Sequence, residues 1–453
     1  MNKVALINPG KLAWHAMQEP LNIGYIASYL EKNNIEVKIF DQLAGQDIEK
    51  EIKNYAPNIV GITSTTMFVY DAYQIADFCR DRGILTVMGG VHVSVLPEEA
   101  LQHVDIVVKG EGELSMLDIV NDNIESKIIT RPYIKNIDEI PPPARHLMQM
   151  DFYLHAPDRL PGGTHLGFVP RGKKVAGIIT SRGCPYSCIF CHNSWKGIPV
   201  RYRSPVYVVE EILYLIARYK IDALFFFDDE FFRNKKRLKE ICELMRKNKI
   251  KLIWGCQARS DTVDMEALEM VRDVGCCWIG FGFESGSQRI LDILKTTAPT
   301  VEQNRKAIDL CRKVGIKCHA TYMLGNPTET IEDLKATFEF VKKNKTDTAG
   351  FFISTPFPGT KLWQWCKEHN LIPEKIDWSK FTTGEITIFA CDTISPEIVL
   401  KFREKMVNYF LALDFYELLL RLIKRPTKIV QIIFHPKRYF EIFKMTLLKL
   451  FEK

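Results

Sequence analysis

The chain has 453 residues, of which 46% are apolar and 26% are charged. This balance is typical of a globular protein with a buried core, and it excludes a disordered chain, a collagen-like repeat and a small disulfide scaffold. At about 150 residues per domain, the length corresponds to roughly two to four domains. No apolar run reaches the ~18–20 residues that cross a bilayer, and the first residues lack the architecture of a signal peptide. We therefore expect a cytoplasmic protein.

The net charge of +6 is concentrated in the C-terminal tail. After residue 400 there are twelve Lys and Arg residues against five Asp and Glu, so the first 400 residues carry a net charge of −1. Nucleic acid is therefore not an expected partner. The tail also carries many aromatic and aliphatic side chains, as basic helices on anionic membranes do. The tail is therefore predicted either to contact a membrane peripherally or to form a helical cap packed on the preceding domain. Membrane contact would indicate a lipophilic substrate.

Residues 1–125 alternate short apolar strands with amphipathic helices. The predicted strands are Val4–Ile7, Val37–Phe40, Ile59–Thr63, Leu85–Met88 and Ile106–Val108, and the predicted helices are Ile23–Glu31, Ile48–Asn54 and Ala72–Arg82. Such alternation predicts βαβ units and hence a doubly wound, Rossmann-like parallel sheet. Sheets of this kind bind ligands beyond the carboxyl ends of their strands.

Residues 126–165 are predicted to be a linker, since prolines and glycines interrupt any regular pattern there. A second alternation follows. Its strands are Val175–Thr180, Ala223–Phe227, Lys251–Cys256, Trp278–Phe283, Lys317–Met323 and Thr348–Ile353, and its helices are Tyr207–Tyr219, Lys235–Asn248, Met265–Val274, Val301–Val314 and Thr330–Asn344. A complete barrel of this type has eight repeats, so we predict a partial, six-stranded (βα) barrel of TIM type over residues 166–385. In the extension 386–453, helices are predicted at Pro396–Leu413 and Tyr416–Lys424.

Three of the twelve cysteines are packed into the loop after the first barrel strand. Cys184, Cys188 and Cys191 have the spacing C-x3-C-x2-C. Thiols of a cytoplasmic protein stay reduced, and a cubane iron–sulfur cluster is ordinarily held by four thiolates. Three thiolates in one loop therefore predict a [4Fe–4S] cluster with one iron left without a protein ligand. The alternatives are a zinc site, which usually takes four ligands and has only His192 nearby, and three packed thiols.

This loop, placed after the first strand of a partial barrel, resembles that of the radical S-adenosylmethionine (SAM) superfamily. The resemblance implies that SAM chelates the open iron and is cleaved reductively to a 5′-deoxyadenosyl radical. It also implies SAM contacts by Phe190 in the loop, by Asp228, Asp229 and Glu230 after the second strand, by Glu284 and Ser285 after the fourth, and by Asn326 and Pro327 after the fifth. Aspartates replace the glycine pair that the family usually has after the second strand. Solvated turns and helix caps are the alternatives for these segments.

The first domain resembles the cobalamin-binding domains that precede some radical SAM barrels. The resemblance rests on segment 19–30 and on small residues at the strand ends, which leave a slot for a nucleotide tail. The implied cobalamin contacts are Ser64, Thr65, Gly89, Gly90, His92, Gly110 and Glu111. The motif Asp-x-His-x-x-Gly of many such domains is missing after the first strand, so no histidine ligand to cobalt is expected from it. His15 is expected to be an ordinary loop histidine, and a domain without corrin is an alternative.

Together these resemblances imply a cobalamin-dependent radical SAM enzyme with a [4Fe–4S] cluster, SAM and cobalamin as cofactors. The expected reaction is methylation of an unactivated carbon of a small or lipophilic substrate, with electrons from a reductant of flavodoxin or ferredoxin type. The radical is generated at the cluster, so no separate catalytic residue is predicted. One alternative is oxidative cyclisation or rearrangement, as in tetrapyrrole ring cyclases. Another is a non-catalytic iron–sulfur or corrinoid-binding protein.

Overall fold

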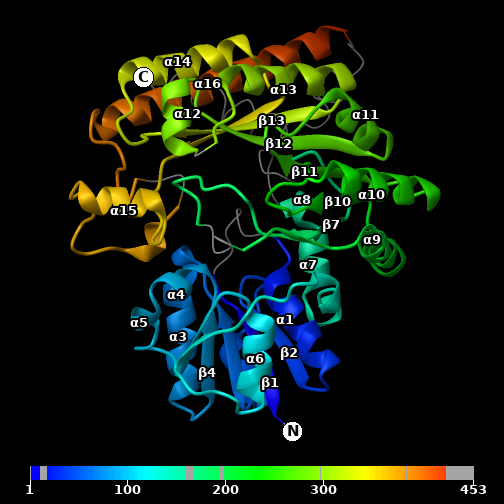
Figure 1. Cartoon of the computed structure of the whole chain (residues 1–453), viewed down its shortest axis with the longest axis vertical. Coiled ribbons are helices and arrows are strands. Elements are labelled where there is room, and N and C mark those ends of the chain that lie inside the picture. The colour runs from blue at the N-terminus through cyan, green and yellow to red at the C-terminus, as the bar shows by residue number, and fades with distance from the viewer. Residues whose placement is uncertain are drawn as a thin grey trace.

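The computed structural model describes residues 2–10, 18–159, 167–192, 198–295, 297–382 and 386–424 (Figure 1). His15 and the tail beyond Lys424, on which the prediction of membrane contact depends, lie outside the described residues. Within those ranges, no helix combines the length and the apolar character that crossing a bilayer requires.

The first domain is built on a parallel, six-stranded sheet with strand order β2-β1-β3-β4-β5-β6. Its strands are β1 (Lys3–Asn8), β2 (Glu36–Asp41), β3 (Ile59–Thr63), β4 (Leu85–Gly89), β5 (Ile106–Lys109) and β6 (Ile128–Thr130). The helices that connect them are α1 (Leu21–Lys32), α2 (Ile48–Tyr55), α3 (Val69–Arg80), α4 (Val91–Val95), α5 (Pro97–Ala100) and α6 (Gly112–Val120). The direction of strand addition reverses between β1 and β3, and such a switch point is where doubly wound sheets bind their ligands.

The second domain is an open barrel, as predicted. Its sheet has the order β14-β13-β12-β11-β10-β7, so each parallel strand pairs with the next along the chain, and β7 and β14 are the edges. The strands are β7 (Val175–Ile178), β10 (Ala223–Phe226), β11 (Ile253–Ala258), β12 (Cys276–Glu284), β13 (Lys317–Leu324) and β14 (Thr348–Ile353). The connecting helices are α9 (Pro205–Tyr219), α10 (Lys235–Lys247), α11 (Met265–Asp273), α12 (Gln288–Leu294), α13 (Val301–Val314) and α14 (Ile331–Lys343).

Helix starts in the barrel are set by local chemistry. A polar side chain immediately before each of five helices accepts a hydrogen bond from a backbone N–H of the first turn, which satisfies a donor that the helix leaves unpaired. These capping residues are Ser204, Asn234, Asp264, Thr300 and Thr330. Asn234, Asp264 and Thr330 follow their strands by short turns, whereas the cysteine loop precedes Ser204 and α12 precedes Thr300. The carboxyl ends of the strands and these connections form one rim of the barrel.

The C-terminal segment joins the two domains and corrects one prediction. α16 (Pro396–Lys424) is one continuous helix rather than the two predicted over this range, and it packs along β14. Before it, α15 (Lys361–Glu368) and the turn Trp378–Lys380 return to the first domain. Trp363 and Trp378 belong to the same buried cluster as Ile7 of β1, and Figure 1 shows α15 beside α4. The barrel and the first domain therefore share a core.

Candidate active site between the domains

The cysteine loop leaves and re-enters the barrel through a short antiparallel ribbon. β8 (Ser181–Arg182) pairs with β9 (Arg201–Tyr202), which directly brackets the loop. Inside the loop, the Ile189 N–H donates to the Leu294 carbonyl at 2.9 Å, and the Ile189 carbonyl accepts from the Leu362 N–H at 2.8 Å. The loop is thus held between the end of α12 and the start of α15.

The three loop thiols differ from the other cysteines in their exposure. Cys184 and Cys188 are half-buried and Cys191 is exposed, whereas the cysteines elsewhere are buried, apart from half-buried Cys277. Desolvation raises the pKa of Cys184, and the nearby charges of Asp229 and Cys188 raise it further. Such mutually repelling thiolates favour a cationic partner, which deprotonates coordinating thiols outright.

This donor set fits an iron–sulfur cluster. No three His, Cys, Asp or Glu side chains converge tightly enough to hold a single ion within the described part of the chain. A cubane cluster does not need that convergence, because each thiolate binds a different iron. Cys184, Cys188 and Cys191 are the residues that would hold it.

The three acidic residues after β10 have different surroundings. Both carboxylate oxygens of Asp228 are occupied by the Thr180 hydroxyl and by the N–H groups of Thr180 and Ser181. Glu230 accepts from the N–H groups of Phe232 and Arg259, and burial raises its pKa to about 7. Asp229 alone lines the cavity described below. Of the three predicted SAM contacts in this segment, Asp229 is the one whose carboxylate faces open space.

Glu284 ends β12 in a strained position. Its φ is +58°, and the pairing of β12 with β13 shifts register between Gly282 and Glu284. Its carboxylate lies 3.1 Å from the Lys295 ammonium, which also donates to the Gly282 carbonyl at 2.6 Å. The Ser285 hydroxyl lies 3.0 Å from the Thr337 hydroxyl on α14. Ser285 therefore links the end of β12 to α14, while Lys295 holds the strained Glu284 at the end of the strand.

The turn after β13 is polar and buried. The Asn326 side-chain amide donates to the Met323 carbonyl and to Glu329, but its oxygen, although buried, has no partner among the described atoms. Burial raises the pKa of Glu329 to about 7, despite hydrogen bonds from the N–H groups of Asn326 and Gly325. Pro327 is also buried. An unpaired buried acceptor is costly, so Asn326 presents an acceptor suited to a polar ligand.

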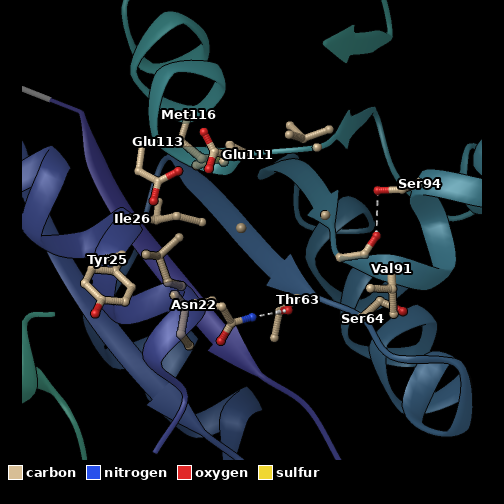
Figure 2. Close-up of a pocket in the computed structure, with 18 of the residues that line it drawn as sticks. Asn22, Tyr25, Ile26, Thr63, Ser64, Val91, Ser94, Glu111, Glu113 and Met116 are labelled. Atoms are coloured by element: carbon tan, nitrogen blue, oxygen red, sulfur yellow. Dashed lines mark hydrogen bonds between the residues drawn. The ribbon is translucent and has the colours of Figure 1, made fainter. Parts of the chain in front are cut away.

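A cavity of about 390 Å³ opens at the switch point of the first domain and reaches the cysteine loop. Figure 2 shows Glu111, Glu113 and Met116 on one side of it and Ser64, Val91 and Ser94 on the other. All the predicted cobalamin contacts except His92 line it, together with residues of the barrel: Ser64, Thr65, Gly89, Gly90, Gly110, Glu111, Ile179, Ser181, Arg182, Gly183, Phe227 and Asp229. The sequence analysis did not single out Asn22, Thr63 or Ser94, which also line it.

The walls of this cavity fit the tail of a cobalamin. The Ser64 hydroxyl is buried and has no hydrogen-bond partner among the described residues. Gly89 lines the cavity, and a Cβ added there would make only ordinary van der Waals contact with Val108, at 3.8 Å, so the glycine leaves room beside the strand. At Gly90, with φ of +108°, an added Cβ would come within 2.3 Å of the Ser64 carbonyl oxygen, so only glycine fits.

His92 lies outside the cavity. Its ring is buried, with Nε2 3.5 Å from Glu99 and the ring edge against Trp378 at 5.1 Å between centroids. The Trp378 indole N–H also donates to Glu99. His92 therefore joins the C-terminal segment to the first domain, and we do not retain it as a cobalamin contact.

Phe190 also contacts the C-terminal segment. It packs against the buried cluster of Leu362, Cys366 and Ala390. This contact holds the aromatic ring beside the start of α15, within the loop that carries the cysteines. Its predicted contact with SAM remains a prediction.

The family comparisons agree with this geometry. A family model described as the radical SAM superfamily matches residues 178–341, and a B12 binding domain model matches residues 16–120. A Pyrococcus horikoshii protein named as an uncharacterized methyltransferase is 34% identical over 425 residues, which cover 86% of this chain and 88% of the relative. This chain belongs to the radical SAM superfamily. The two family models confirm the predicted set of cofactors, and the methyltransferase relative supports the prediction of an enzyme.

Two further matches extend the comparison. The anaerobic magnesium-protoporphyrin IX monomethyl ester cyclase of Rubrivivax gelatinosus is 27% identical over 380 residues, covering 76% of this radical SAM chain and 66% of the cyclase. The solved structure of the cobalamin-dependent SAM radical enzyme OxsB superposes with a TM-score of 0.71 at 18% identity, covering 98% of this chain and 72% of that one. The second match confirms the predicted fold class of Rossmann-like sheet and partial barrel.

Proposed function

We propose that this radical SAM enzyme methylates an unactivated carbon of a small, uncharged or lipophilic substrate held between the barrel and the first domain. The supporting observation is that one cavity is lined both by the slot residues Ser64 and Gly89 and by Gly183 and Asp229 beside the cysteine loop. A reaction that combines a substrate radical with a cobalamin-borne methyl group requires both cofactors to face one substrate. The shared cavity meets that requirement.

When bound, the cluster with SAM supplies a carbon radical and cobalamin supplies the methyl group. The residues of the chain bind these cofactors and orient them toward the substrate. Cys184, Cys188 and Cys191 would hold the cluster, and the slot at Ser64 and Gly89 would hold the cobalamin tail.

SAM would lie among polar groups of the barrel rim. Glu284 and the unpaired oxygen of Asn326 sit at the carboxyl ends of β12 and β13, where barrels of this type carry their chemistry. Asp229 stands on the same rim, after the carboxyl end of β10, and its charge acts on Cys184. These groups would orient the cosubstrate, and the apolar walls around them would limit access of water to a reactive radical.

The interior of the barrel favours an uncharged substrate. Along β13, buried and half-exposed residues alternate, and the half-exposed set of His319, Thr321 and Met323 faces the interior, where His319 stacks on Trp278 at 5.3 Å. On the neighbouring β14, Phe352 is 36% exposed. None of these side chains is acidic and none is Lys or Arg, so they offer no ion pair to a charged substrate.

The test is anaerobic turnover with SAM labelled in its methyl group, using lipophilic cell extracts as the source of substrate. We expect 5′-deoxyadenosine together with a product that carries the label. Labelled product without 5′-deoxyadenosine, or 5′-deoxyadenosine without any labelled product, would contradict the proposal.

The similarity to the cyclase favours one second candidate. In an oxidative cyclisation the same radical would form, but the product would gain no carbon. Mass analysis of the product distinguishes the two reactions, because methylation adds one CH2 and an oxidative cyclisation adds none.

A further inference from the structure

The segment that precedes helix α10 contacts the cysteine loop. Tyr186, which lies between Cys184 and Cys188, is half-buried. Its hydroxyl accepts a hydrogen bond from the Arg233 guanidinium at 3.1 Å, and the Arg259 guanidinium lies 3.6 Å from its ring centre. Arg233 stands two residues before α10. The start of α10 therefore adjoins the loop that would carry the cluster.

The same region is strongly basic. Residues 233–239 contain five Lys and Arg and no acidic residue. Arg233, Lys236 and Lys239 are exposed. Two nearby cations are neutralised, because Lys235 pairs with Asp264 at 2.6 Å and Arg259 with Asp261 at 2.9 Å. Among the described side chains, Lys236 and Lys239 form no ion pair, so their charges face the solvent.

Helix geometry adds to this charge. The amino end of an α-helix carries about half a positive charge, and the first turn of α10 contains no acidic residue that would offset it. Clustered charges of one sign steer oppositely charged proteins and raise their association rates. We call the surface formed by Tyr186, Arg233, Lys236 and Lys239 the α10 face.

We propose that the α10 face is the docking surface for an acidic, one-electron carrier protein. The proposal rests on the proposed function, which requires reduction of the cluster from outside. The carrier would lose one electron and the cluster held by Cys184, Cys188 and Cys191 would gain it, with no proton or group transferred. Residues 1–400 have a net charge of −1, so three exposed cations within seven residues depart from the average of the main body. Tyr186, a residue of the loop itself, belongs to this surface.

The test compares two reductants on the reconstituted holoenzyme. Reduced flavodoxin, an acidic carrier, is mixed with the enzyme and cluster reduction is followed by absorbance and by electron paramagnetic resonance; dithionite replaces flavodoxin in the parallel experiment. The variant is K236E/K239E, which leaves the Arg233–Tyr186 contact intact. The matched control is K313E/K317E, which reverses two exposed lysines at the end of α13 and the start of β13, at the opposite rim of the barrel.

We expect K236E/K239E to slow reduction by flavodoxin by about tenfold or more, with dithionite reduction unchanged and the control unaffected. For the wild type, rising salt should slow only the flavodoxin reaction. Equal rates of cluster reduction by flavodoxin in the variant and the control would overturn the proposal. So would a wild-type rate of reduction by flavodoxin that does not change with salt concentration. So would binding of a labelled RNA oligomer that the double variant abolishes, since it would assign the face to nucleic acid.

Failure of the proposed function gives a different result. If dithionite-reduced enzyme transfers no methyl group while flavodoxin reduction still depends on Lys236 and Lys239, the result contradicts the proposed reaction but supports the docking surface. If the double variant also loses dithionite reduction, the neutral variant K236Q/K239Q is tested in its place. We expect this variant to slow reduction by flavodoxin by a smaller factor and to leave reduction by dithionite unchanged.

Discussion

Arg182 donates a hydrogen bond to Glu111 at 2.8 Å across the boundary between the barrel and the first domain. Arg182 precedes Cys184 by two residues, and Glu111 lies in the turn that follows β5 and lines the cavity. Arg201, the strand partner of Arg182, donates to the same carboxylate at 2.8 and 3.0 Å, and Arg182 also donates to Glu113 at 2.6 Å. The loop that would bind the cluster is therefore tied to the turn that would border cobalamin.

Replacing Glu111 by Gln should destabilise the protein. Glu111, Arg182 and Arg201 are all nearly buried, with side chains 7%, 11% and 6% exposed, and breaking a buried ion pair typically costs about 3–5 kcal/mol. Urea unfolding followed by circular dichroism measures the loss. Glu125→Gln, at an exposed position of the same domain, should change stability by less than about 0.5 kcal/mol. Equal effects of the two substitutions would show that the Arg182–Glu111 contact is not a stabilising one.

The buried Glu329 should make stability depend on pH. Burial raises its pKa to about 7 in the folded protein, whereas a free Glu titrates near 4.3. The folded state then binds more protons between these values, so this contribution to stability is complete below pH ~4 and falls until about pH 7. Glu329→Gln removes it. The variant should gain roughly 3 kcal/mol relative to wild type between pH 4.5 and pH 8, as measured by urea unfolding at both pH values. A difference independent of pH would contradict the assignment.

Side chains introduced at Gly89 should close the slot without disturbing the sheet. Gly89 lines the cavity, and a Cβ added there would make only ordinary van der Waals contact with Val108, so we expect the longer side chain of Gly89→Leu to occupy cavity space. We expect a large loss of cobalamin binding, followed by absorbance after gel filtration, with little change in thermal unfolding. Gly89→Ala should give a smaller loss. Undiminished cobalamin binding by the Leu variant would place the cofactor elsewhere.

Iron content should depend on the loop cysteines alone. Cys188→Ala should lose the cluster absorbance and most of the iron after anaerobic reconstitution. The loop supplies only three thiolates for a cluster that is ordinarily held by four, so the loss of one leaves too few protein ligands. Cys311→Ala, in the buried face of α13, should keep both. Iron retained by Cys188→Ala, or lost by Cys311→Ala, would contradict the assignment of the ligands.

The order of the main strands could be predicted because buried parallel strands are short apolar runs, and the five long barrel helices could be predicted because their helical spacing follows a polar cap. The short helices α4, α5, α6 and α12, which have no side-chain cap, were missed. β6 was missed because it has only three residues, and its pairing with β5 shows that the first sheet extends beyond residue 125 into the predicted linker. The two helices predicted over Pro396–Lys424 are one, since the residues between them include neither Pro nor Gly, and nothing there ends a helix.

At the site, the sequence indicated the segments but not the orientation of each side chain. Asp228, Asp229 and Glu230 are adjacent, yet only the fold decides that Asp229 reaches the cavity while the other two bind backbone. The engagement of Glu111 by Arg182 and Arg201, and of His92 by Trp378, joins residues 71 to 286 positions apart. No local sequence pattern predicts contacts between residues so far apart in the chain.

The central claim is that the cysteine loop and the switch-point cavity place their two cofactors against one common space. The most direct measurement is pulsed electron paramagnetic resonance on enzyme loaded with cob(II)alamin and a reduced cluster. The account predicts dipolar coupling between the two paramagnetic centres, which disappears when Gly89→Leu excludes cobalamin. Two strong signals with no mutual coupling would contradict it.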